Sequence, residues 1–248
     1  LGVTTLEMDV VITKDNKVIL SHEPFMNPEI ATPPSGQQFS SPKDKSFNIY
    51  AMTYEEVSKW DVGMKFHPNF PLQKKMPAIK PLLSELIAAV EEYTKAKKLK
   101  PLNYNIETKC APSTDGISHP NPEAFVSLLM DVVTKEKISK RTIIQSFDKR
   151  TLQVLHQSFP SIKTSYLFGG SNKKTPEQLV DDLGFRPDMF SPVYTLIDES
   201  FIEACGKLNI KVIAWTVNEE KDIEKMAALG VDGIISDYPD RFSILKNR

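Results

Sequence analysis

Residues 5–13 read Thr-Leu-Glu-Met-Asp-Val-Val-Ile-Thr, and this stretch decides the fold because it combines a strand with two carboxylates. Its apolar residues alternate to both faces, which is typical of a strand in a parallel sheet that is covered on both sides. Glu7 and Asp9 are two residues apart and therefore point to the same face. Two such carboxylates in a buried strand repel each other unless a positive group lies between them. We therefore expect a cation at this strand.

The residues that follow return beside this first strand. The turn at residues 13–17 is too short for anything except an antiparallel return, so residues 18–21 should pair with it. The residue after this second strand is His22. The hairpin therefore predicts an imidazole close to the two carboxylates.

A third carboxylate, Glu107, ends the strand-like run at residues 103–107. Divalent cations such as Ca²⁺ and Mg²⁺ prefer oxygen ligands, so the three carboxylates predict one such ion. Lys109 is two residues further on and would add a second positive group on the same face. A metal ion next to a histidine indicates hydrolysis. The alternatives are an exposed strand face for Glu7 and Asp9, and a structural salt bridge between Glu107 and Lys109.

The rest of the chain alternates short apolar runs with amphipathic helices, which predicts a parallel sheet wrapped by helices. Capping residues mark three helix starts: Asn121 before Pro122, Thr175 before Pro176, and Thr53 before a short helix at Val57. Further helices are expected to begin at Pro81 and at Asn218. The expected strands of this series are residues 5–13, 103–107, 142–146, 164–167, 189–191, 211–217 and 233–236.

Seven strands alternate in this way, and we expect one further strand and helix ahead of Leu1. Eight units close a (β/α)₈ TIM barrel, a single domain over residues 1–248 with its active site at the carboxyl ends of the strands. Residues 23–77 interrupt the alternation, and we interpret them as an insertion over the mouth of that site, packed through Tyr50, Trp60, Phe66 and Phe70. A doubly wound open sheet is the alternative, but no glycine-rich phosphate loop follows any strand.

Composition narrows the function classes. A net charge of −1 over 248 residues gives no broad basic surface for nucleic acid. No apolar stretch is long enough to cross a membrane. The cysteines, Cys110 and Cys205, match no metal-ligand spacing, and we expect buried free thiols. The oligomeric state and the compartment have no signal in the sequence, which opens without a methionine.

Several motifs in this order resemble the glycerophosphodiester phosphodiesterase family. They are L-E-M-D-V-V-I-T-K-D, V-I-L-S-H-E-P, N-I-E-T-K, I-I-Q-S-F-D, V-I-A-W-T-V-N and G-V-D-G-I-I-S-D-Y-P-D. The resemblance covers nearly the whole chain. It implies a TIM-barrel hydrolase that uses a divalent cation, Ca²⁺ or Mg²⁺, to cleave glycerophosphodiesters into sn-glycerol 3-phosphate and an alcohol.

The resemblance also assigns roles to individual residues. It places the metal ligands at Glu7, Asp9 and Glu107, one of two catalytic histidines at His22, and a phosphate contact at Lys109. Trp215 would form an aromatic wall for the glycerol, with plain packing as the alternative.

Two departures from the family pattern stand out. The family's opening His-Arg-Gly strand end, which carries the other histidine, would lie upstream of Leu1. Glu23 follows His22 where the family usually has aspartate, which affects the surroundings of the histidine. A related phospholipase C- or D-type barrel, or a non-catalytic binding barrel, is the alternative reading.

Overall fold

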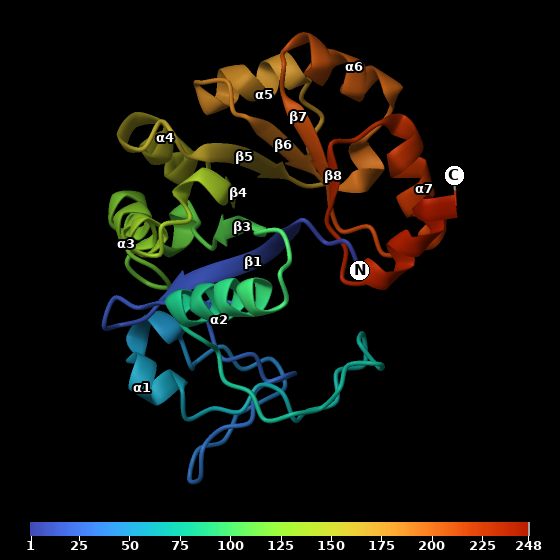
Figure 1. The fold of residues 1–248 in the computed structure, drawn as a ribbon. Coiled ribbons are helices and arrows are strands. Elements are labelled where there is room, and N and C mark those ends of the chain that lie inside the picture. Colours follow the sequence, from blue (N-terminus) through green and yellow to red (C-terminus); the bar gives the residue numbers. More distant parts are fainter. Residues whose placement is uncertain (248) are drawn as a thin grey trace. The chain divides into compact units, whose positions relative to one another are not determined.

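The computed structural model describes residues 1–247 and shows an α/β fold around one eight-stranded sheet (Figure 1). The strand order is β2-β1-β3-β4-β5-β6-β7-β8, so the strands of the alternating series follow one another without the reversal that a doubly wound sheet requires. The strands are β1 Thr5–Ile12, β2 Val18–Leu20, β3 Asn103–Thr108, β4 Thr142–Ser146, β5 Lys163–Phe168, β6 Met189–Pro192, β7 Lys211–Ala214 and β8 Gly233–Ile234.

The expected hairpin is confirmed at the start of the chain. β2 pairs antiparallel with β1, with Ile12 opposite Val18 and Val10 opposite Leu20. Asn16 takes a left-handed backbone conformation (φ 58°) in the turn, which asparagine tolerates better than most residues. The expected α/β class with parallel strands is also confirmed. Barrel closure, a further unit ahead of Leu1 and the insertion at residues 23–77 stay predictions.

Two compact units divide the chain, and each contains part of β1 and part of β3. The first unit holds residues 1–7, 102–107 and 139–248, and its strands β4 to β8 pair in parallel register. Its helices lie on the yellow-to-red part of the ribbon in Figure 1. They are α4 Lys149–Ser158, α5 Pro176–Leu183, α6 Glu199–Lys207 and α7 Glu220–Leu229.

The second unit holds residues 8–101 and 108–138. It contains the hairpin and the helices α1 Tyr54–Val57, α2 Leu83–Ala96 and α3 Pro122–Lys135. A buried cluster joins the hairpin to residues 23–77 through Val11, Ile19, Met26, Ile49 and Trp60. The long irregular segment therefore has its own packed core, as expected for Trp60. The expectation was wrong for Phe66, whose side chain is 56% exposed.

Two helix starts differ from the prediction, each because its expected first residue has another bonding partner. Asn218 does not begin α7, since its side chain hydrogen-bonds to Ser236 and Asp237; the cap is Glu219. Pro81 does not begin α2, because its carbonyl accepts the backbone N–H of Leu20 in β2. α2 starts two residues later, at Leu83.

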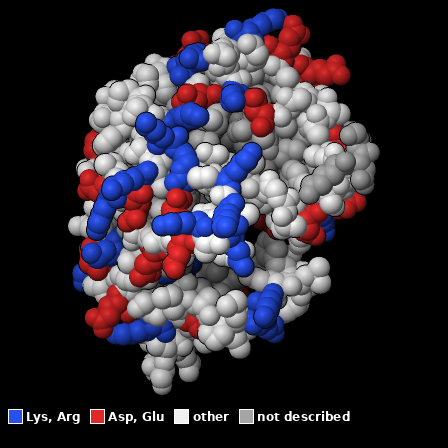
Figure 2. Space-filling view, viewed as in Figure 1, with Lys and Arg blue, Asp and Glu red and all other residues white. Residues whose placement is uncertain are grey.

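Charged side chains are interspersed on the surface, with lysine and arginine next to aspartate and glutamate over the face shown in Figure 2. Within residues 1–247, no helix has both the length and the apolar character needed to span a membrane. Both cysteines are buried and neither forms a disulfide, as the sequence predicts.

Candidate active site

Strands β1 and β3 bring three carboxylates together. They run side by side in parallel, and the backbone bonds Asn103 N–Thr4 O (3.0 Å) and Lys109 N–Val10 O (3.2 Å) fix their register on either side of the carboxylates. One oxygen from each of Glu7, Asp9 and Glu107 lies within 4.8 Å of the others. We call these three residues the carboxylate trio. The sequence predicted their convergence.

The surroundings of the trio are polar on the β4 side. Gln145 in β4 is the register partner of Glu107 and donates from Nε2 to Oε1 of Glu7 at 2.7 Å. Its own Oε1 accepts a hydrogen bond from Nδ2 of Asn105 at 2.8 Å. Glu107 is buried whereas Glu7 is exposed, so the expectation that β1 buries both of its carboxylates was wrong for Glu7. The trio thus has a buried end at β3 and an exposed end at β1.

Lys109 lies against Asp9, with its Nζ 3.0 Å from Oδ1. Both side chains are more than four-fifths buried, at 16% and 18% exposure. An ion pair in such a place is less screened than one at the surface. In this structure the lysine therefore neutralises part of the charge of the trio.

His22 lies two residues after the end of β2, and its side chain is 70% exposed. Its Nδ1 contacts Oε1 of Glu23 at 2.9 Å, and this hydrogen bond is the main cause that raises the pKa of His22 above 6.5. Burial and the Lys109 ammonium oppose the rise, whereas the Asp9 carboxylate supports it. Because Nδ1 faces Glu23, Nε2 is the nitrogen left to exchange a proton.

Trp215 belongs to the first unit, just beyond β7. Its Nε1 donates to the carbonyl of Ser191 at 2.7 Å, and its ring meets Phe147 edge to face at 5.5 Å. The indole is partly exposed. These contacts fix the ring in place, and a role for it in substrate binding stays a prediction.

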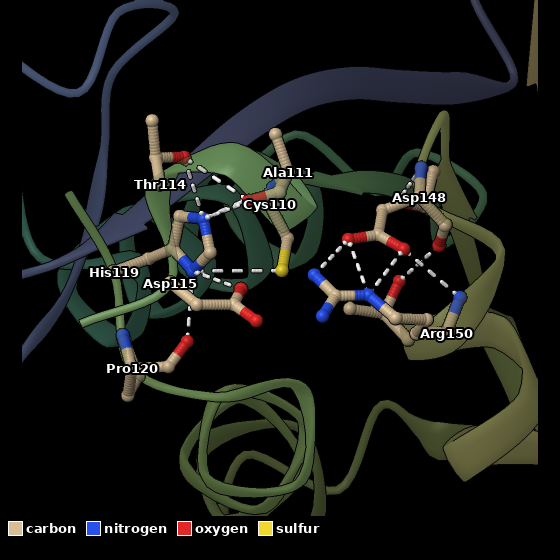
Figure 3. A network of polar contacts seen from close by, with 10 residues as sticks. Cys110, Ala111, Thr114, Asp115, His119, Pro120, Asp148 and Arg150 are labelled. Atoms are coloured by element: carbon tan, nitrogen blue, oxygen red, sulfur yellow. Dashed lines mark hydrogen bonds and ion pairs between the residues drawn. The ribbon is translucent and has the colours of Figure 1, made fainter. Parts of the chain in front are cut away.

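The second unit contains another group of potential ligands, formed by Cys110, Asp115 and His119 (Figure 3). His119 is buried, and its Nδ1 lies 2.7 Å from the carbonyl of Pro120. Its Nε2 accepts the backbone N–H of Ala111 at 3.0 Å. Both ring nitrogens are thus bonded to fixed backbone groups. These contacts support a structural role for His119.

The remaining histidines are also in packing positions. His156 stacks on Phe185 at 4.1 Å between ring centroids, and His67 lies against Phe70 at 5.0 Å. Figure 3 also shows Asp148, the cap of α4, whose buried carboxylate accepts a 2.6 Å bond from Nη2 of Arg150. That pair stabilises the start of the helix.

Sequence reasoning missed three polar residues next to the predicted ones: Gln145, Asn105 and Lys80. Gln145 and Asn105 are amides inside buried strands, which is a usable signal because such groups need partners there. Lys80 stands in an irregular segment, and nothing in the sequence shows that it is buried.

The chain is similar to known proteins over nearly its whole length. The sequence model of the glycerophosphoryl diester phosphodiesterase family matches residues 1–241. A glycerophosphodiester phosphodiesterase of Caldanaerobacter subterraneus subsp. tengcongensis is 27% identical over 244 residues, which cover 97% of this chain and 84% of the relative. A crystal structure of a Silicibacter pomeroyi protein is 27% identical with a TM-score of 0.85, covering 99% of this chain and 84% of its own. The structure of an Oleispira antarctica phosphodiesterase in complex with the product sn-glycerol-3-phosphate shares the fold at 18% identity and a TM-score of 0.74, covering 100% of this chain and 86% of its own.

Proposed function

Because the chain belongs to the glycerophosphoryl diester phosphodiesterase family, we propose that it hydrolyses glycerophosphodiesters with one divalent cation at the carboxylate trio and His22 as the proton donor. The products are sn-glycerol 3-phosphate and an alcohol. The convergence of the trio carries this proposal, since a bound cation would offset the repulsion among three carboxylates that Lys109 compensates only in part.

The donor set fits Ca²⁺ or Mg²⁺. Two oxygens bound to one Ca²⁺ ion at about 2.4 Å cannot be more than about 4.8 Å apart, and the oxygens of the trio lie within that separation. Mg²⁺, with bonds of about 2.1 Å, would need them within about 4.2 Å. All three donors are carboxylate oxygens, the ligand type that both ions prefer. Asn105, two residues before Glu107 in β3, has a buried side-chain oxygen without a partner among the described residues. A water molecule would satisfy that oxygen.

The bound cation would neutralise the phosphate charge. The pair formed by Lys109 and Asp9 indicates how the chain itself contributes. With a cation held by Asp9, the ammonium of Lys109 would be able to contact a phosphate oxygen. Lysine serves such a contact as a compact point charge. The lysine thus compensates the trio in the free enzyme and the substrate in the complex.

His22 completes the reaction by moving a proton. Hydrolysis breaks the bond between phosphorus and the alcohol oxygen, adds a water oxygen to phosphorus, and leaves an alkoxide that needs a proton. The proton that the water loses restores the imidazolium at the end of the cycle. The protonated imidazole donates from Nε2, while Nδ1 stays on Glu23. The raised pKa of His22, caused mainly by the hydrogen bond to Glu23, widens the pH range in which the imidazole can donate a proton. Trp215 would line the glycerol through its partly exposed ring.

The test is a hydrolysis assay with and without a chelator, on glycerophosphocholine, glycerophosphoethanolamine and phosphatidylinositol. We expect release of sn-glycerol 3-phosphate from the first two substrates, loss of activity with the chelator, and recovery with added Ca²⁺ or Mg²⁺. Activity that is unchanged by the chelator would contradict the metal assignment. Cleavage of phosphatidylinositol alone would assign a phospholipase C-type head group instead.

A further inference from the structure

Lys80 is a buried lysine that the proposed reaction does not use. It lies in the segment before α2 with only 5% of its surface exposed. This segment runs along β2, where Leu82 bridges to Ile19 and the carbonyl of Pro81 accepts the N–H of Leu20. Burial of an ammonium group is costly unless its surroundings compensate the charge. The position of Lys80 therefore calls for an explanation.

The contacts of Lys80 lead to the residues around His22. Its Nζ donates to Oγ of Ser21 at 2.7 Å, and that hydroxyl donates to the carbonyl of Glu23 at 2.5 Å. The backbone N–H of Ser21 is bonded to the carbonyl of Asp9 at 3.0 Å. The tripeptide Ser21-His22-Glu23 is therefore held from β1 on one side and from Lys80 on the other.

Electrostatic interactions connect the same residues as the hydrogen bonds do. The pKa of Glu23 is lowered first by its hydrogen bond to His22, and the Lys80 ammonium lowers it further. Burial lowers the pKa of Lys80 to about 8, which the Glu23 carboxylate partly opposes. Lys80 is consequently protonated at neutral pH. The Glu23 carboxylate therefore interacts with two groups, the ammonium of Lys80 and the imidazole of His22.

We propose that Lys80 and Glu23 are positioning residues for His22. Lys80 fixes the turn through the Ser21 hydroxyl, and Glu23 holds the imidazole by Nδ1 so that Nε2 is presented for proton transfer. The role of the imidazole in catalysis rests on the function proposed above, whereas its orientation does not. Outer partners of this kind commonly change activity by about ten- to a hundredfold when they orient a functional histidine.

The groups that face His22 come from three segments. Glu23 adjoins it in the chain, Asp9 belongs to β1, and Lys109 follows β3. Asp9 and Glu23 favour the imidazolium, and Lys109 disfavours it. Loss of the Glu23 charge should therefore lower the pKa of His22, because the largest favourable contribution disappears. Loss of the Lys80 contact should act in the same direction, since the Glu23 side chain then no longer stays aligned with Nδ1.

The kinetic test compares K80M, E23Q and the double variant, with K43M as a control at an exposed lysine. We expect K80M and E23Q each to lower kcat about tenfold with KM within about twofold, and K43M to match the wild type. The double variant should be no slower than the slower single variant, because both act through one imidazole. Multiplication of the two effects would overturn the shared role.

A second measurement does not depend on turnover. NMR titration of the His22 ring, assigned with H22Q, should give a lower pKa in E23Q and in K80M than in the wild type. A His22 pKa that is the same in K80M as in the wild type would overturn the role of Lys80. If K80M does not fold, S21A, which removes only the hydroxyl, replaces it with the same expected result. If no variant and no wild-type protein hydrolyses the substrates, the proposed function fails while the titration still tests the positioning.

Discussion

Within residues 1–247, three potential metal ligands come together in two places, and the two groups differ in how their ligand atoms are already used. The carboxylate trio on β1 and β3 concentrates negative charge, of which Lys109 compensates a part. The second group, Cys110 with Asp115 and His119, places its histidine nitrogens on backbone partners of Ala111 and Pro120. Proximity of ligands is therefore not sufficient for a metal site. A site also needs ligand atoms that gain from a cation more than they lose from their present partners.

The same contrast separates two histidines. His22 has a side chain that is 70% exposed and contacts its neighbour through one nitrogen. His119 is buried and uses both nitrogens, with Thr114 as a further neighbour at 3.0 Å from Nε2. An imidazole can transfer protons only when one nitrogen can exchange them, and a saturated buried ring instead stabilises the loop that surrounds it.

The largest expected effect comes from the buried ligand of the trio. E107Q keeps the volume of the side chain but removes one charge from the metal ligands. We expect Ca²⁺ or Mg²⁺ binding measured by calorimetry to be lost, and kcat/KM to fall by about a thousandfold, since a metal ion contributes several kcal/mol to the stabilisation of the transition state. E55Q, at an exposed helical glutamate paired with Lys59, is the matched control. Normal metal affinity in E107Q would place the ion elsewhere.

Substitution of the two histidines should give opposite results. H22A is expected to lower kcat by about a hundredfold or more and to leave metal binding and the free energy of unfolding nearly unchanged, because general acid catalysis is lost from an exposed ring. H119A should lower the free energy of unfolding by about 1–3 kcal/mol, since buried backbone groups of Ala111 and Pro120 lose their partner. The folded H119A protein should keep its kcat. Denaturant titration and steady-state kinetics together check the pair, and near-normal turnover in H22A would refute its assignment.

Most of the fold was predictable because its signals are local. Alternating apolar patterns located the strands, and capping residues such as Thr53 and Thr175 marked helix starts that the structure confirms. The errors at Asn218 and Pro81 share one cause: each residue bonds to a partner from another segment, which local preference does not contain. The packing of residues 23–77 was visible only in part, because Trp60 and Phe66 look alike in sequence and one is buried while the other is exposed.

The candidate site was predictable to the extent that it lies on strands. The period of two along β1 placed Glu7 and Asp9 on one face, and parallel pairing brought Glu107 to them. The contact between Lys109 and Asp9 was not predicted, because two strands offer several partners to one long side chain. The burial of Lys80 depends on how an irregular segment packs along β2, and periodicity contains no information about that.

A smaller effect is expected in the pH dependence of kcat/KM, which reports on His22. The pKa of His22 is raised above 6.5, mainly by Glu23, so the protonated donor persists above that pH. We expect kcat/KM to be level below the raised pKa and to fall about tenfold per pH unit above it. Because the pKa of His22 is higher in the folded than in the unfolded state, protonation of His22 adds to the free energy of unfolding. This contribution is complete below pH 6.5 and is lost as the pH rises through the folded-state pKa. A descending limb centred at or below 6.5 would show that another group donates the proton.

The smallest expected effect tests the second group directly. Cobalt(II) bound through a thiolate gives a charge-transfer absorption that oxygen ligands do not give. We expect none in the wild type, because the thiol of Cys110 lies 3.5 Å from Nδ1 of His119, which already has a partner in the carbonyl of Pro120. C110S should then bind cobalt(II) as the wild type does and lose at most about 1 kcal/mol of unfolding free energy. A thiolate band that disappears in C110S would establish a second metal site, and the difference between the two groups would then lie in ligand softness instead of ligand saturation.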